Sequence, residues 1–410
     1  MNEAALAERI ARESYGRLLA LLTARTRDVA AAEDALADAF AAALTAWPRI
    51  GAPEKPEAWL FAAAKRKLID GARRARTASE AQADLALAAE EIEAEVGEGQ
   101  APDRRLSLMF ACAHPAIEES IRTPLMLQTV LGFSAERIAA AFLIEPKAMG
   151  QRLVRAKAKL HEAGVPFEIP PPALWPERLA AVLDAIYAAY GVGWTDATGA
   201  DPERRGLAEE GVWLGRVLAA QTPREPEALG LLSLMLHLEA RRAARRGAGG
   251  EFIPLEEQDV SLWNADQILE ADVLLVTASR LERPGRFQLE AAIQSAHAVR
   301  RKRGFADWDA IITLYEGLAL LTRSPVAQLN HAAALAHRDG PAAALDLVDA
   351  LELAHPNMLT YQPYWALRAD LCAKLGRKEA ALAAYAEAIA RESDPTVLAF
   401  LRGRAARLEN

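Results

Sequence analysis

The sequence has little of what a β-rich or a secreted protein needs. Of its 410 residues only 6% are aromatic. β-branched residues are scarce, and alanine, the best helix former, is abundant. The two cysteines, Cys112 and Cys372, lie too far apart in sequence to suggest a disulfide framework, so a reducing, cytoplasmic setting is expected. This composition predicts an all-α fold and excludes a β-sandwich or a doubly wound sheet.

Membrane and enzyme signatures are also missing from the sequence. No run of ~18 uncharged apolar residues is present, and the charged N-terminus is unlike a secretory signal. HExxH, Walker and GxSxG patterns are absent. Cys112 and His114 alone are too few ligands for a metal site, and Gly191-Val192-Gly193 is interpreted as a turn. We therefore expect no enzyme activity, no cofactor, no metal and no membrane partner.

The net charge of −8 is unevenly distributed along the chain. Residues 1–76 and 102–164 each carry three more basic than acidic residues, whereas residues 77–101 hold seven acidic residues and no basic one. Residues 165–410 are acidic overall. Only charges within about a Debye length, ~10 Å, act on a phosphate, so these local clusters matter more than the overall charge. The sequence therefore divides into two basic units, an acidic linker and an acidic extension.

The first basic unit is predicted to end in a cationic helix. This helix begins at Pro56, contains Trp59 among its apolar residues, and extends to about Arg76. One stripe of the helix must pack inward while the other faces out. The outer stripe favours binding to nucleic acid, and the alternative is a solvated basic helix end. The cations of this stripe are Lys65, Arg66, Lys67, Arg73, Arg74 and Arg76, with Asp70 as the one acid.

The second basic unit predicts a helix-turn-helix. Ser134 is a good N-cap for a short helix over Ala135–Phe142, and a turn leads to a longer helix over Lys147–Ala163. A short helix, a tight turn and a longer helix are the order of this DNA-binding arrangement. A helical hairpin with an ordinary charged face remains the alternative.

The longer helix has an apolar face and a cationic face. The residues expected to pack inward recur every three or four positions: Met149, Leu153, Ala156 and Leu160. The N-terminal part of a recognition helix enters the groove, so the residues placed for base edges are Lys147, Gln151 and Arg152. Those placed for phosphates are Arg155 and Lys159.

Taken together, the two basic units resemble an extracytoplasmic-function sigma-70 factor. Residues 32–40, AEDALADAF, resemble the sigma-2 helix that docks on the β′ subunit of RNA polymerase. Residues 56–74 resemble the helix that melts and contacts the −10 promoter element, and residues 132–156 resemble the sigma-4 helix-turn-helix that contacts the −35 element. The resemblance implies polymerase-binding roles for Glu33, Asp34 and Asp38. It implies −10 roles for Trp59, Lys65, Arg66, Asp70, Arg73 and Arg74.

The acidic extension resembles that of a sigma-factor subgroup with tetratricopeptide-like (TPR-like) repeats. Matching stretches include residues 255–263, 288–298 and 324–330. In addition, Ala343, Leu347 and Ala350 are predicted to repeat as Ala381, Tyr385 and Ala388, a period of 38 residues. Stacked repeats present a concave surface that binds proteins or peptides, and the alternative is that they only stabilise the chain.

The expected organisation has five segments: a sigma-2-like domain (1–76), an acidic linker (77–101), a sigma-4-like domain (102–165), a helical extension (166–280) and TPR-like repeats (281–410). The expected partners are core RNA polymerase, through its β′ and β subunits, and promoter DNA. The repeats are expected to bind a protein partner or to touch the basic units of the same chain. A TPR-type scaffold or adaptor and a helix-turn-helix regulator that binds DNA alone are the alternatives.

Overall fold

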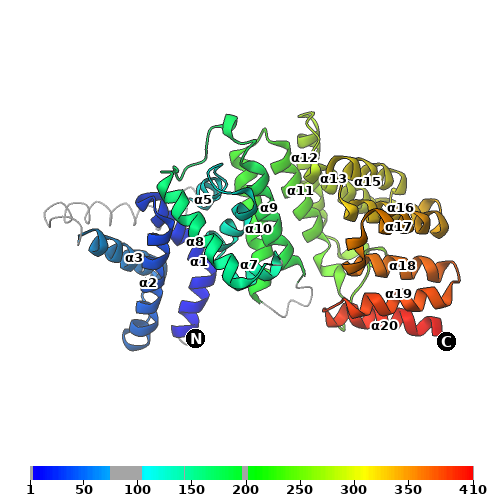
Figure 1. Cartoon of the computed structure of the whole chain (residues 1–410), viewed down its shortest axis with the longest axis horizontal. Coiled ribbons are helices and arrows are strands. Elements are labelled where there is room, and N and C mark those ends of the chain that lie inside the picture. Colours follow the sequence, from blue (N-terminus) through cyan, green and yellow to red (C-terminus); the bar gives the residue numbers. More distant parts are fainter. Residues whose placement is uncertain (1–2, 74–103, 143, 196–201, 410) are drawn as a thin grey trace. The chain divides into compact units, whose positions relative to one another are not determined.

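The computed structural model of the chain describes residues 3–73, 104–142, 144–195 and 202–409 (Figure 1). These ranges are α-helical with short 3-10 segments, and their β-type pairing is limited to an isolated bridge between Arg246 and Phe252. The predicted all-α fold is therefore confirmed for the described residues. The chain forms two compact units. We call residues 1–195 with 202–217 the N-terminal unit, and residues 218–410 with 196–201 the C-terminal unit.

The N-terminal unit begins with three helices that share one core. These are α1 (Glu3–Thr26), α2 (Val29–Ile50) and α3 (Pro56–Arg73). Asp28 caps α2 by accepting a hydrogen bond of 3.0 Å from the Ala31 N–H, which fixes where the chain turns out of α1. The core between the three helices is built from alanines, leucines and large aromatics, among them Leu36, Trp47, Leu60 and Phe61.

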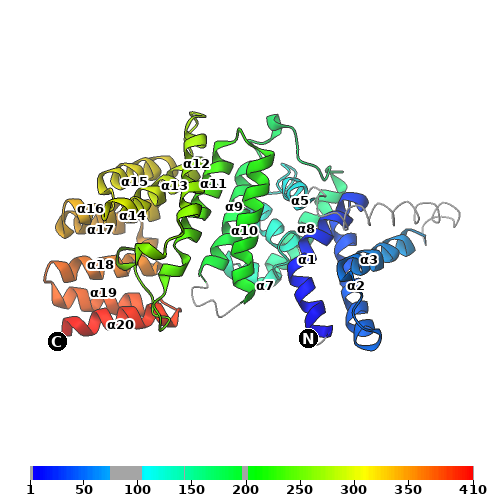
Figure 2. The same cartoon turned by 180° about the vertical axis from the view of Figure 1, so that it is seen from behind.

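The same unit continues with α5 (Arg104–Cys112), α6 (Glu119–Thr129), α7 (Ala135–Ala141) and α8 (Pro146–Glu162). Ser134 caps α7 as predicted, because its hydroxyl accepts a hydrogen bond of 3.3 Å from the Arg137 N–H. The predicted inward face of α8 is also confirmed, since its buried residues are Met149, Leu153, Ala156 and Leu160. Figure 2 shows α8 close to α1 and α2, and α8 packs directly on α2.

Two further helices belong to this unit, α9 (Leu179–Thr195) and most of α10 (Pro202–Gln221). α9 runs through residues 191–193, so the interpretation of Gly191-Val192-Gly193 as a turn is wrong. A glycine inside a helix costs about 1 kcal/mol. The apolar residues of α9 are buried up to Tyr190, and this packing outweighs that cost. Sequence alone does not reveal such packing.

The C-terminal unit is a succession of helices in which most pack on the next, while α15 packs on α13 across the short α14 (Figure 1). It starts with the end of α10 and continues through α11 (Pro226–Ala240), α12 (Ala265–Ser279), α13 (Arg286–Ala298), α14 (Arg300–Arg303), α15 (Trp308–Thr322), α16 (Pro325–Arg338), α17 (Pro341–Ala354), α18 (Gln362–Lys374), α19 (Lys378–Ala390) and α20 (Pro395–Glu409). Short 3-10 turns at 242–245, 255–257, 260–262 and 356–360 lie between them.

The predicted 38-residue period in this unit is wrong by one position. Ala343, Leu347 and Ala350 are exposed, and Leu347 is 41% exposed. The buried residues of α17 are their neighbours Ala344, Val348 and Leu351, which correspond to Ala381, Tyr385 and Ala388 of α19 at a spacing of 37. The helix starts agree with this spacing, since α16 and α18 begin 37 positions apart, as do α17 and α19. One α16–α17 pair is therefore followed by a matching α18–α19 pair.

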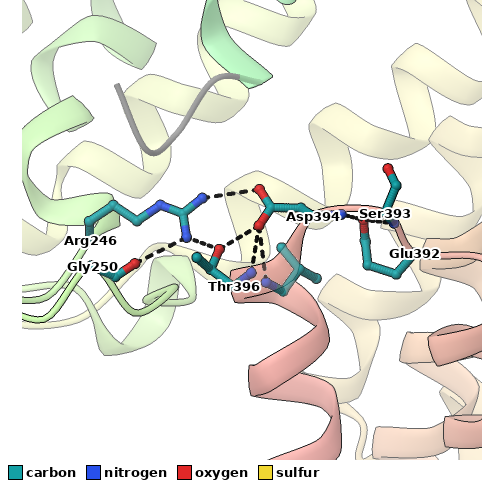
Figure 3. Close-up of polar contacts among 7 residues, drawn as sticks. Arg246, Gly250, Glu392, Ser393, Asp394 and Thr396 are labelled. Atoms are coloured by element: carbon teal, nitrogen blue, oxygen red, sulfur yellow. Dashed lines mark hydrogen bonds and ion pairs between the residues drawn. The ribbon is translucent and has the colours of Figure 1, made fainter. Parts of the chain in front are cut away.

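A polar contact joins two distant segments of the C-terminal unit (Figure 3). The Arg246 guanidinium donates to Asp394 Oδ2 at 3.3 Å and to the Thr396 hydroxyl. Asp394 Oδ1 in turn accepts from the N–H of Thr396 at 2.8 Å and of Val397 at 3.3 Å, so it caps α20. The loop after α11 and the last helix are thereby held together, although about 150 residues of sequence separate Arg246 from Thr396.

Candidate nucleic-acid and polymerase interface

The outer face of α8 carries most of the residues predicted to contact the −35 element. Lys147, Gln151, Arg155 and Lys159 are all exposed there. Glu145 caps the helix by accepting a hydrogen bond of 2.8 Å from the Ala148 N–H, and Pro146 occupies the first turn. No acidic residue lies between Pro146 and His161, so no carboxylate of the helix offsets the cations on this face. A polyanion is the natural partner of such a face.

Arg152, the fifth predicted residue, is placed differently from the other four. Its guanidinium pairs with Glu118 at 3.3 Å and donates to the Ser120 hydroxyl, both near the start of α6. The hydrogen bond from Ser120, together with the nearby cations of α8, lowers the pKa of the Glu118 carboxyl. In this arrangement Arg152 ties α8 to α6, a role that sequence reasoning did not anticipate.

An open hollow of about 520 Å³ lies on the outer face of α8. Lys147, Gly150, Gln151, Val154 and Arg155 line it. Gly150 and Val154 are not among the predicted DNA-contacting residues. Gly150 lies three residues after Lys147 and Val154 three residues after Gln151, and this helical spacing is the signal that places them on the same face.

The predicted −10 helix corresponds to α3, and its apolar stripe packs inward. Trp59 is partly buried and its ring meets that of Trp47 edge-on, with centroids 5.6 Å apart. Arg66 and Lys67 are exposed, and Lys65 is partly buried. Asp70 and Arg73 belong to the last turns of α3, while Arg74 lies outside the described residues.

The acidic residues of α2 predicted to bind polymerase fall into two groups. Asp34 and Asp38 are exposed, and Asp38 pairs with Lys67 of α3 at 3.3 Å. Glu33, by contrast, forms an ion pair with Lys157 of α8, in which the side chains are only 14% and 11% exposed. Burial raises the pKa of the Glu33 carboxyl, an effect that the Lys157 ammonium opposes. In this structure Glu33 is therefore engaged within the chain rather than presented to a partner.

Further contacts hold α2 and the helices after the linker together. His161 of α8 lies 3.5 Å from Asp28 Oδ2 and 3.4 Å from the Arg27 carbonyl oxygen. α1 also approaches the end of α6 very closely, because a Cβ added to Gly16 would lie 1.7 Å from the Val130 carbonyl oxygen. The structure thus packs the segment resembling sigma-2 against the segment resembling sigma-4.

The described residues offer no evident place for a metal centre. No three of their His, Cys, Asp or Glu side chains are grouped so that they could hold an ion. Cys112 is buried beside the Thr129 hydroxyl, and burial raises the pKa of its thiol to about 12. As for membranes, none of the helices in the described ranges has the length and apolar character that a span requires.

Comparisons with known proteins identify two parts of the chain. Residues 10–78 match Sigma-70 region 2, and residues 178–279 match a family of unknown function, DUF6596. The uncharacterized protein R00370 of Rhizobium meliloti (strain 1021) is 37% identical over 381 residues, which cover 92% of this chain and 89% of the relative. No solved structure matches the chain. The chain therefore carries a Sigma-70 region 2 domain at its N-terminus and belongs to the same family as the rhizobial protein.

Proposed function

We propose that this protein is a sigma factor that directs core RNA polymerase to specific promoters, with an extension that regulates or supports this activity. The observation that carries the proposal is the Sigma-70 region 2 match, which spans α2, α3 and most of α1. The cationic outer face of α8 supports it independently, because it follows a short helix and a turn in the order of a helix-turn-helix. Residues 102–165 are accordingly proposed as the sigma-4-like domain.

The proposed mechanism assigns a separate step to each basic unit. Asp34 and Asp38 of α2 contact polymerase, and Glu33 joins them once its pairing with Lys157 opens. The exposed cations of α3 hold the phosphates of the −10 element, and Trp59, which is partly buried against Trp47 in this structure, stacks on an unstacked base once that contact opens. The N-terminal half of α8 enters the major groove at the −35 element. The acidic linker, residues 77–101, which lies outside the described residues, connects the two units.

Transcription by the reconstituted holoenzyme tests the proposal. Full-length protein and core polymerase are supplied with the protein's own upstream region, and run-off transcripts are measured. We expect Arg152→Ala and Arg155→Ala each to abolish transcripts while polymerase binding persists. Arg402→Ala, which removes an exposed arginine from α20, is the matched control and should leave transcription unchanged. Full activity of the Arg155→Ala protein contradicts the assigned face.

Two binding measurements separate this function from its alternatives. A sigma factor co-purifies with the β and β′ subunits, whereas a TPR-type scaffold or adaptor does not. A helix-turn-helix regulator shifts duplex DNA in a gel without polymerase, whereas the sigma factor proposed here requires it. Since the −10 helix has no use in such a regulator, its presence favours the sigma factor.

A further inference from the structure

Val154 is an apolar side chain in the middle of the cationic face of α8. It is 64% exposed, while Leu153 beside it is buried in the core. Valine is a poorer helix former than alanine or lysine because its branched side chain loses rotamer freedom. An exposed apolar residue alone means little. Here, however, neither packing within the described chain nor helix formation accounts for the residue.

Gly150 lies one turn before Val154 on the same face. A Cβ added to it would meet no described heavy atom within 4 Å, in contrast to Gly16, where it would strike the Val130 carbonyl. Glycine lowers helix stability relative to alanine. No close contact within the described chain requires a glycine at this position, and without a Cβ the helix backbone here is open to the approach of another molecule.

The chemistry around the hollow points to the edge of an A·T base pair. Gln151 offers an amide that matches the N6 and N7 atoms of adenine, and the C5 methyl group of thymine is the one apolar group on the major-groove edges of the bases. Lys147 and Arg155 on either side supply cations for phosphates or guanine. We infer that Val154 contacts a thymine methyl group in the −35 element, next to an adenine bound by Gln151, and that Gly150 allows the helix to lie close to the bases.

This inference rests on the proposed function, and its test is built in two stages. First, full-length protein with core polymerase selects promoters from a duplex library with a randomised −35 region. Then each thymine of the selected −35 element is replaced in turn by uracil, which lacks only the C5 methyl group. We expect one thymine at which uracil weakens holoenzyme binding by about fourfold, the loss expected for one buried methyl group. The Val154→Ala protein should bind the thymine and uracil promoters equally.

Gly150→Ala gives a second, independent readout. Alanine should raise the midpoint of thermal unfolding because it favours the helix. It should also weaken binding to every selected promoter, since its methyl group occupies the hollow. A protein that is both more stable and weaker in DNA binding cannot be explained by misfolding.

The possible outcomes distinguish a failure of this inference from a failure of the proposed sigma-factor function. If no promoter is selected, the sigma-factor proposal fails and the inference fails with it. If promoters are selected but uracil has the same effect on the native and Val154→Ala proteins, the inference alone is overturned. The same holds if the selected −35 element contains no thymine. Loss of polymerase binding by Val154→Ala, with unchanged promoter preference, would assign the hollow to a protein partner and overturn it as well.

Discussion

At the scale of single residues, Gly16 shows how closely two helices meet in the N-terminal unit. A methyl group added there would lie 1.7 Å from the Val130 carbonyl oxygen, far inside any contact distance, so α1 and the end of α6 would have to move apart. We predict that Gly16→Ala lowers the free energy of unfolding by about 2–3 kcal/mol, despite the better helix propensity of alanine. Gly150→Ala is the matched control, because its methyl group enters open space.

Urea unfolding of the full chain, followed by helical circular dichroism, measures both glycine variants. The expected pattern is opposite signs: destabilisation at position 16 and stabilisation of up to ~1 kcal/mol at position 150. Equal stabilisation by the two substitutions would show that α1 and α6 do not pack as described.

His297 of α13 links stability to pH. Burial, together with the nearby Arg241 and Arg300 guanidinium groups, lowers the pKa of its imidazole to about 4, while Glu256 acts in the opposite direction. In the unfolded chain the pKa is about 6.5. Between these values the unfolded state binds more protons than the folded state, so stability falls as the pH drops from about 6.5 toward 4.

The size of this pH effect follows from the shift in pKa. A shift from about 6.5 to about 4 lowers the free energy of unfolding by about 3 kcal/mol once the imidazole is fully protonated. We predict that His297→Gln, which cannot take up a proton, flattens the dependence of the unfolding free energy on pH between 6.5 and 4.5. The measurement is a series of urea titrations across that range. An unchanged slope would place the acid sensitivity in other groups, such as Glu256, whose pKa is lowered by its hydrogen bond to His337.

At the scale of elements, the contact between α2 and α8 depends on one nearly buried ion pair. Removal of Lys157 leaves the Glu33 carboxylate without its partner, and burial of an unpaired charge is costly. We predict that Lys157→Ala lowers the free energy of unfolding by about 3 kcal/mol. Lys157→Met combined with Glu33→Gln should recover much of that loss, because neither side chain then carries a charge.

A double-mutant cycle in urea tests the pair. The coupling between positions 33 and 157 is obtained from the single variants Lys157→Met and Glu33→Gln and from the variant that carries both substitutions. Additive effects would mean that the ammonium and the carboxylate do not meet, which would also free Glu33 for polymerase without any rearrangement.

The sequence predicts a feature of these elements well when residues close together in the chain determine it, and poorly when distant residues do. The cap at Ser134 and the inward face of α8 were predicted correctly, because each depends on neighbouring residues. The repeat in α17 was misplaced by one residue, since in an alanine-rich helix Ala343 and Ala344 look alike until α16 and α18 pack on one side. The pairing of Glu33 with Lys157 joins residues 124 positions apart, and no spacing rule predicts such a contact.

At the scale of the whole molecule, the N-terminal unit extends to Val217, beyond the two basic units within residues 1–165 that resemble sigma-2 and sigma-4. α9 packs on α5 and α6, although the boundary between the sigma-4-like domain and the extension was predicted between residues 165 and 166. Arg105 of α5 pairs with Glu210 of α10, and its guanidinium also lies over the Trp213 ring at 4.2 Å. α9 and the first part of α10 therefore complete the fold of the N-terminal unit, although the match to DUF6596 covers them.

This packing changes how the role of the extension should be tested. Removal of residues 166–410 would uncover the apolar surface of α6 and leave Arg105, which is mostly buried, without Glu210. We predict that this truncated protein is destabilised by about 3 kcal/mol or more and fails in transcription for that reason alone. A chain that ends after Gln221 keeps α9 and α10, and it should unfold cooperatively with nearly native stability.

Transcription by the two truncated proteins, beside their urea unfolding curves, then separates folding from regulation. If the chain ending at Gln221 is stable and transcribes more than the full chain, the C-terminal unit is inhibitory; if it is stable but inactive, that unit supports the activity. Equal transcription by the full chain and the stable truncation would refute a regulatory role for the C-terminal helices. Equal stability of the two truncations would refute the assignment of α9 and most of α10 to the N-terminal unit.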